Sequence, residues 1–240
     1  MSFSPKNTIL SEIEPATILK LGNRLELLHL KRGTVLQEIG TPVEWVYFPD
    51  TALISVSSET VDGESVSGTL VGWRGAYGAF EACGSRQSFS NATIQISGDC
   101  WRIRAQHYRA LFDESPGLRK AIHKHVESVL NESRQLVACA ALHPVERRMC
   151  RVLLDASDRS HGGSELSLTQ EALANILGVQ RTTVAVSASA LQREGLIRTG
   201  RGTIHLLDRE GLGRNACSCR RTIQYADSVI FHSTDEVCEA

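Results

Sequence analysis

The stretch "LGVQRTTV", residues 177–184, places a glycine between two short apolar runs and a polar cluster directly after it. Gly178 can adopt a positive φ, the conformation in which a helix commonly ends at a tight turn. Two leucines one helical turn apart precede this glycine, and Val184 and Leu191 follow it on one face of a second helix. This spacing predicts a helix-turn-helix, in which the small Ala174 lets the two helices cross closely.

The polar cluster after the glycine contains Gln180, Arg181, Thr182 and Thr183. In a helix-turn-helix the second helix enters the major groove of DNA and its first turns contact base edges. These four side chains are therefore predicted to touch DNA. Ser187 stands where such a helix usually carries a large apolar residue. The alternative to DNA binding is a helix pair with a purely structural role.

The segment "GLIRTGRGTIHLLD", residues 195–208, has two glycines around an arginine between two apolar runs. This pattern is typical of a β-hairpin, and a hairpin directly after a helix-turn-helix is a wing. Arg198 and Arg201 are expected to contact phosphates. Residues 144–214 carry ten arginines, eight acidic residues and no lysine, a composition that suits phosphate and guanine contacts.

The first half of the chain is predicted to form strands. Its runs "TVLQEIG", "WVYFPDTALISVSSE", "ESVSGTLVGW" and "NATIQISGDCWRIRA" are rich in β-branched or aromatic residues and are separated by turn-forming residues. Short strands at roughly even spacing predict a small antiparallel barrel or sandwich. We place this domain at residues 1–115.

A long helix is predicted over residues 116–143, where apolar residues recur at steps of three and four. One face of this helix is expected to form a dimer seam, and Pro144 is expected to end it. The DNA-binding domain then covers 144–215, and a less regular C-terminal tail covers 216–240. The predicted seam residues are Leu118, Ile122, Val126, Val129 and Leu136.

Composition excludes several classes of protein. The chain has 240 residues, 42% of them hydrophobic, and a formal net charge of -1. It contains no run of about 18 apolar residues that would span a membrane, and its start does not resemble a signal peptide. Seven scattered cysteines without a signal peptide predict a reducing, cytoplasmic location. No paired catalytic carboxylates, nucleophile–base motif or phosphate loop is present, so an enzyme is not predicted.

The chain resembles the Crp/Fnr family, the catabolite activator/FNR-type transcription regulators, over almost its whole length. The resemblance rests on "LKRGTVLQEIG" (30–40), on the long helix and on "LTQEALANILGVQRTTV" (168–184). It implies an α+β fold with an N-terminal cyclic-nucleotide-binding-like β-roll, a long dimerisation helix and a C-terminal winged helix-turn-helix. It further implies a homodimer that binds two half-sites of double-stranded DNA, and it names RNA polymerase as a candidate partner.

By position, the family's base-reading residues correspond to Gln180, Arg181, Thr182 and Val186. Arg181 matches the arginine with which the catabolite activator reads a guanine. Thr182 and Val186 replace that protein's glutamate and its second arginine, so the target sequence is expected to differ. A glutamine can pair with an adenine edge, and a threonine methyl can contact thymine.

The sensor half departs from the family in "GAYGAFEACGSRQSFSNATIQ" (75–95). Gly78 matches, but Ala79 stands where the family has the ribose-binding glutamate. Ser90 stands at the position of the phosphate-binding arginine, with Asn91 beside it, and Glu81 and Arg86 are the nearby substitutes. We predict a degenerate pocket that does not bind cyclic AMP. A different small ligand, a partner protein, or a ligand-binding module without DNA reading are the alternatives.

No cofactor and no metal site are predicted. No cysteine precedes Cys83, so FNR's N-terminal iron–sulfur cluster has no counterpart among the residues before it. Cys217, Cys219 and Cys238 could bind a metal or form a disulfide, but their spacing is not C-x-x-C. His123 and His125 are interpreted as exposed residues of the long helix.

Overall fold

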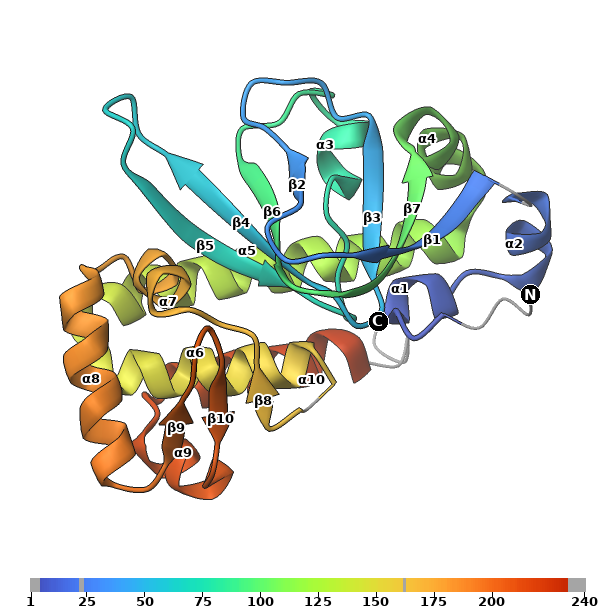
Figure 1. The fold of residues 1–240 in the computed structure, drawn as a ribbon. Helices are drawn as coiled ribbons and strands as arrows, with labels where there is room; N and C mark the ends of the chain where they lie inside the picture. Colours follow the sequence, from blue (N-terminus) through green and yellow to red (C-terminus); the bar gives the residue numbers. More distant parts are fainter. Residues whose placement is uncertain (1–4, 22–23, 162, 233–240) are drawn as a thin grey trace.

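The computed structural model describes residues 5–21, 24–161 and 163–232. They form an N-terminal β-roll, a long helix beneath it and a smaller helical domain with a short sheet (Figure 1). Among the described helices, none has both the length and the apolar character that a membrane span requires.

The β-roll consists of two antiparallel sheets with small helices at their edges. One sheet has the order β1-β7-β3 and the other the order β2-β6-β4-β5. The elements are α1 (Thr8–Ser11), α2 (Pro15–Leu21), β1 (Leu25–Leu30), β2 (Val35–Gln37), β3 (Trp45–Pro49), β4 (Leu53–Glu59), β5 (Ser65–Val71), α3 (Ala79–Cys83), β6 (Asn91–Ile96), β7 (Gly98–Arg104) and α4 (Ala105–Glu114).

Alternation along β3 divides the apolar core of the roll into two clusters. Val46 and Phe48 pack toward α4, where Phe48 meets the ring of Tyr108. Tyr47, between them, points the other way and joins Ile54 in the cluster between the sheets. This alternation with a period of two residues is the pattern from which the strands were predicted. The predicted mixed fold, a sheet domain followed by a helix-turn-helix, is confirmed.

The long helix α5 spans Pro116–Leu142. Ser115 caps its start, because its hydroxyl accepts the backbone N–H of Leu118 at 3.1 Å, and Pro116 occupies the first turn, where its missing N–H costs nothing. The helix ends at His143, whose backbone is extended because Pro144 follows it.

The predicted dimer seam is wrong at two positions. Leu118 and Ile122 are only 0% and 2% exposed, because they pack into the core of the roll of the same chain. Val129 and Leu136 are partly covered, and Val126 is 37% exposed. The side of α5 that faces its own chain carries buried residues every seven positions, at Leu118, His125, Glu132 and Cys139.

The C-terminal part is helical with one small sheet. It contains α6 (Val145–Arg159), β8 (Glu165–Leu166), α7 (Gln170–Leu177), α8 (Arg181–Arg193), β9 (Ile197–Thr199), β10 (Ile204–Leu206), α9 (Arg209–Asn215) and α10 (Cys219–His232). The expected irregular tail is wrong over α10, which packs along α5. Ile223 and Ile230 are buried seven residues apart on α10, and the hydroxyl of Ser128 donates to Asp227 at 2.6 Å.

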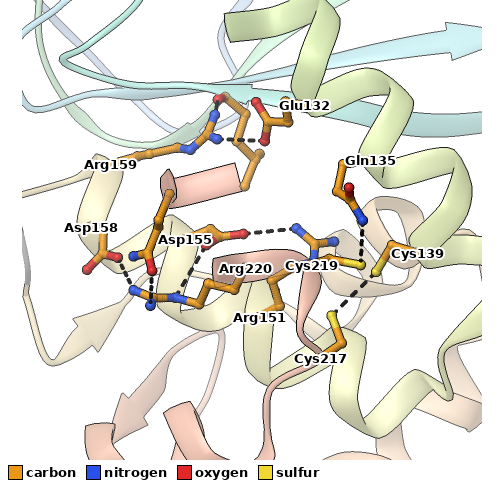
Figure 2. Close-up of polar contacts among 12 residues, drawn as sticks. Glu132, Gln135, Cys139, Arg151, Asp155, Asp158, Arg159, Cys217, Cys219 and Arg220 are labelled. Carbon is orange, nitrogen blue, oxygen red and sulfur yellow. Dashed lines mark hydrogen bonds and ion pairs between the residues drawn. The ribbon is translucent and has the colours of Figure 1, made fainter. Parts of the chain in front are cut away.

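Arg159, the last residue of α6, joins all three parts of the molecule. Its guanidinium forms an ion pair with Glu132 of α5, with 2.6 Å between nitrogen and oxygen, and donates a hydrogen bond to the carbonyl oxygen of Leu70 in β5. Figure 2 shows this pair beside a wider charge network. The other pairs of the network are Arg151–Asp155, Arg209–Asp158, Arg220–Asp155 and Arg220–Asp158.

We expect Glu132→Ala to lower the free energy of unfolding by about 3 kcal/mol, because it leaves a largely buried guanidinium without its carboxylate. Urea titration followed by circular dichroism measures the change. Glu127→Ala, on the exposed side of the same helix, is the matched control and should change the free energy by no more than about 0.5 kcal/mol. Equal effects of the two substitutions would contradict a stabilising role for the pair.

Candidate nucleic-acid interface

The turn between α7 and α8 has the geometry that its glycine requires. Thr169 caps α7 by accepting the N–H of Ala172 at 3.0 Å. The helix ends at Gly178, which adopts φ 61° and ψ 44°, and the next N–H, of Val179, donates to the carbonyl of Ala174 at 3.0 Å. These bonds occupy the free carbonyls at the helix end and aim the chain into α8.

One face of α8 is buried against the rest of its domain. Val184 and Leu191 are in the core, as their spacing predicts, and they pack there with Leu173 of α7. Ser187 is fully buried on the same face, and its hydroxyl lies 3.3 Å from a carboxylate oxygen of Glu146 on α6. The hydroxyl at this unusual position therefore has a polar partner.

The opposite face of α8 is open to solvent at its first two turns. Gln180, Arg181 and Thr182 are exposed and Thr183 is partly covered. Val186, one turn further, is 69% exposed. Gln180 is the N-cap residue, but its side chain makes no capping hydrogen bond. The five residues predicted here to contact DNA thus lie at the N-terminal end of one helix, and all but Thr183 are exposed.

The wing is the hairpin of β9 and β10, in which Arg198 lies opposite His205. The strand β8 extends it to three strands. Arg198 and Arg201 are both exposed. Arg201 occupies the turn of the hairpin, as the sequence predicts.

A groove of about 500 Å³ lies between the start of α8 and the wing. Arg181 and Arg201 both line it, together with Thr169 and Gln170 at the start of α7. The structure therefore brings a predicted base-reading residue and a predicted phosphate-binding residue to one surface. The lining carries two exposed cations, Arg181 and Arg201, against one exposed carboxylate, Glu171, so the net positive charge of the groove favours a polyanion.

A family model for the Crp-like helix-turn-helix domain matches residues 147–214, from α6 into α9. A solved Crp/Fnr-family regulator from Thermus thermophilus is 27% identical. It aligns over 80% of this chain and 98% of its own length with a TM-score of 0.64. The chain contains a Crp-like helix-turn-helix domain and is similar to Crp/Fnr regulators over most of its length.

Two further proteins are similar to most of the chain. The transcriptional regulatory protein Btr of Bordetella pertussis is 25% identical over 80% of this chain and 83% of that protein. A Crp/Fnr-family protein from Eubacterium rectale shares the fold at 19% identity, with a TM-score of 0.67 over 88% of this chain and 98% of its own. The chain is accordingly a transcription regulator with a DNA-binding domain, and the prediction that it is not an enzyme is confirmed.

The β-roll contains a cavity of about 460 Å³. Glu81 and Ser90 line it, but the other four residues of the predicted effector pocket do not. Gly78 and Ala79 are buried at the start of α3, Arg86 is exposed, and the side-chain amide of Asn91 donates to Glu59. Burial raises the pKa of Glu81, which favours its neutral form.

His125 is a cavity residue that the sequence analysis missed. It is 4% exposed rather than solvated, and its Nε2 atom lies 3.2 Å from the nitrogen and 3.0 Å from the oxygen of Ala76. Burial lowers the pKa of His125, so the ring is neutral near pH 7. The available signal was its position three residues after Ile122 and four before Val129, on the inward side of α5.

Proposed function

We propose that the chain reads a specific DNA sequence through α8 and anchors itself to the backbone through the wing. Gln180, Arg181, Thr182, Thr183 and Val186 contact base edges in the major groove, and Arg198 and Arg201 contact phosphates. The observation that carries this proposal is that all of these side chains except the partly covered Thr183 are exposed, and that Arg181 of α8 and Arg201 of the wing line one groove. The match of the family model to this domain favours a DNA reader over an isolated ligand-binding module.

The chemistry of the exposed residues defines the expected operator. Arg181 has a planar fork of donors that suits O6 and N7 of a guanine, and Gln180 suits N6 and N7 of an adenine. The methyl groups of Thr182 and Val186 suit a thymine methyl. With two apolar contacts beside one arginine, each half-site should combine one guanine with neighbouring A·T pairs. Contact with RNA polymerase stays a prediction.

We expect Arg181→Ala to weaken binding to the preferred operator about 10- to 100-fold, because one bidentate base contact contributes roughly 1–3 kcal/mol. The operator is first selected from a random DNA pool with the wild-type protein, and affinities are measured by fluorescence anisotropy at fixed salt. Arg193→Ala, at the exposed far end of the same helix, is the matched control. Equal affinities of the two variants would contradict base reading by Arg181.

The homodimer is proposed to form through the outward side of α5. Val126, Leu130 and Val137 are exposed there at spacings of four and seven residues, and Val137 is 73% exposed. An apolar stripe at this spacing is the pattern that packs two helices in a coiled coil. Around a two-fold axis at this stripe, two copies of α8 could enter successive major grooves roughly 34–36 Å apart.

We expect Val137→Glu to convert the dimer to a monomer, because the two-fold axis brings two carboxylates into one apolar seam. Sedimentation velocity at micromolar concentration measures the mass. Val61→Glu adds the same charge at an exposed turn of the β-roll and should leave the dimer intact. A wild-type monomer, or a dimer that survives Val137→Glu, would contradict the proposed seam.

The cavity of the roll is proposed to hold an apolar ligand with a small polar group rather than a cyclic nucleotide. Phe80, Phe89 and Val129 supply its apolar wall, and Glu81 and Ser90 supply polar groups. Among the described residues that line it, none is an arginine or a lysine. A phosphate placed there would lose its hydration without gaining a cationic partner. A docked partner protein is the alternative effector.

Calorimetric titration of the protein with cyclic AMP should give no saturable heat at millimolar nucleotide. Ser90→Trp, which fills the cavity, serves as the matched control and should behave identically. Saturable binding of one cyclic AMP per chain that Ser90→Trp abolishes would contradict the proposal.

A further inference from the structure

Four potential metal ligands meet where the long helix ends and the last helix begins. Cys139 lies in the last turn of α5 and His143 caps it, while Cys217 precedes α10 and Cys219 is its first residue. One ligand atom from each of the four side chains lies within 4.8 Å of all the others. Figure 2 shows the sulfur atoms of Cys139, Cys217 and Cys219 close to one another.

The local sequence explains the convergence. Cys139 lies in the last turn of α5 and His143 is the residue that caps this helix, so both lie at the same end of α5. Cys217 and Cys219 are separated by one residue, and the N–H of Cys217 is fixed by the carbonyl of Arg147 on α6 at 3.2 Å. Cys139 and His143 at the end of α5 therefore face Cys217 and Cys219 on the segment that begins α10.

Two separations lie within about 0.3 Å of the edges of a tetrahedron around one zinc ion. The Sγ atoms of Cys139 and Cys217 are 3.5 Å apart, and Sγ of Cys219 is 3.4 Å from Nδ1 of His143. A zinc ion with Zn–S bonds of about 2.3 Å and Zn–N bonds of about 2.0–2.1 Å holds its ligand atoms roughly 3.5–3.8 Å apart. An iron–sulfur cluster needs wider ligand spacing, because its own iron and sulfide atoms separate the cysteines.

The surroundings of the cluster suit thiolates. The three cysteines form a buried cluster of their own, each at most 2% exposed. The amide of Gln135 donates to Sγ of Cys219 at 3.1 Å, and the charge of Arg151 acts on Cys139 and Cys217. Such donors and cations orient and neutralise metal-bound sulfur. By contrast, Cys100 and Cys150 lie in predominantly aliphatic and aromatic cores, as ordinary buried cysteines do.

We propose that Cys139, His143, Cys217 and Cys219 bind one zinc ion per chain in a closed tetrahedral site. Three sulfurs and one imidazole favour zinc over magnesium or calcium, which prefer oxygen ligands. Four protein ligands leave no open position, so the site is structural rather than catalytic. On binding, the thiols release their protons to solvent and the neutral His143 ring donates the lone pair of Nδ1. This proposal replaces the prediction of no metal site; Cys238 lies outside the described residues.

The position of the site gives the ion a mechanical role. The ligand pairs are separated by the whole of α6 to α9, so zinc would close a loop that contains the helix-turn-helix and the wing. It would also fasten α10 to α5 beside the extended residue His143, where the DNA-binding domain begins. Bound zinc therefore restricts how that domain can turn relative to α5. The site does not depend on which bases α8 reads.

The experiment measures metal directly in the full chain, purified under reducing conditions, equilibrated with zinc and dialysed. Elemental analysis should give one zinc per chain, and substitution with Co²⁺ should produce the absorption of a tetrahedral thiolate complex. Cys217→Ser should lose zinc at least tenfold more readily to a chromophoric chelator. Cys150→Ser, another buried thiol of the same domain, is the matched control and should retain wild-type zinc. His143→Gln, at a partly exposed position, tests a ligand whose loss leaves the core intact.

Several results would overturn the proposal. Wild-type protein without zinc after equilibration would do so whether or not the variants fold. Iron with inorganic sulfide would indicate a cluster instead. In protein prepared without reductant, a mass deficit of two hydrogen atoms in a linked Cys139–Cys217 peptide would indicate a disulfide. Full zinc retention by both Cys217→Ser and His143→Gln would place the ion elsewhere.

Discussion

The ion pair between Arg159 and Glu132 holds the three parts of this regulator in one arrangement. A guanidinium at the end of α6 meets a carboxylate of the long helix and a carbonyl of β5. Burial alone would lower the pKa of Arg159, but the carboxylates of Glu132 and Asp155 raise it above its usual value. The arginine is therefore charged at any pH at which the protein folds, and a conformational change that separates the parts must rehydrate this charge or supply another partner.

Weaker contacts set the position of the DNA-reading surface relative to the roll. The guanidinium of Arg32 donates to the carbonyl of Gly202 in the wing at 3.1 Å, and Asn175 of α7 donates to Ser65 at 3.3 Å. Because the acceptors are neutral and the partners are exposed, each of these hydrogen bonds contributes only about 1 kcal/mol to the free energy of unfolding. These hydrogen bonds add little to the apolar core that Leu53 and Leu70 of the roll share with α6 and α7, so this domain is attached to the roll mainly by apolar packing.

The helix-turn-helix was predictable because its determinants are local. Gly178 predicts the turn, and Val184 and Leu191 predict one buried helix face, all within fifteen residues. The structure has the turn and the buried face at these positions. The roll was predictable in kind from its strand alternation. The inward face of α5 was not predictable. Two apolar stripes run side by side along this helix, and only tertiary packing decides which of them is buried. The four-ligand cluster was also hidden, because Cys139 and Cys217 are far apart in sequence and meet only through the packing of α10.

The buried residues His125, Glu132 and Cys139 recur every seven positions along α5, so they share one edge of a rigid rod. His125 lines the roll cavity, Glu132 pairs with Arg159 at the end of α6, and Cys139 contacts Cys217 just before the last helix. Because one helix carries all three, a rotation about its axis displaces them together and in the same sense. A molecule that turns α5 from the cavity would therefore loosen the ion pair and the cysteine cluster in a single movement, without a chain of intermediate side chains.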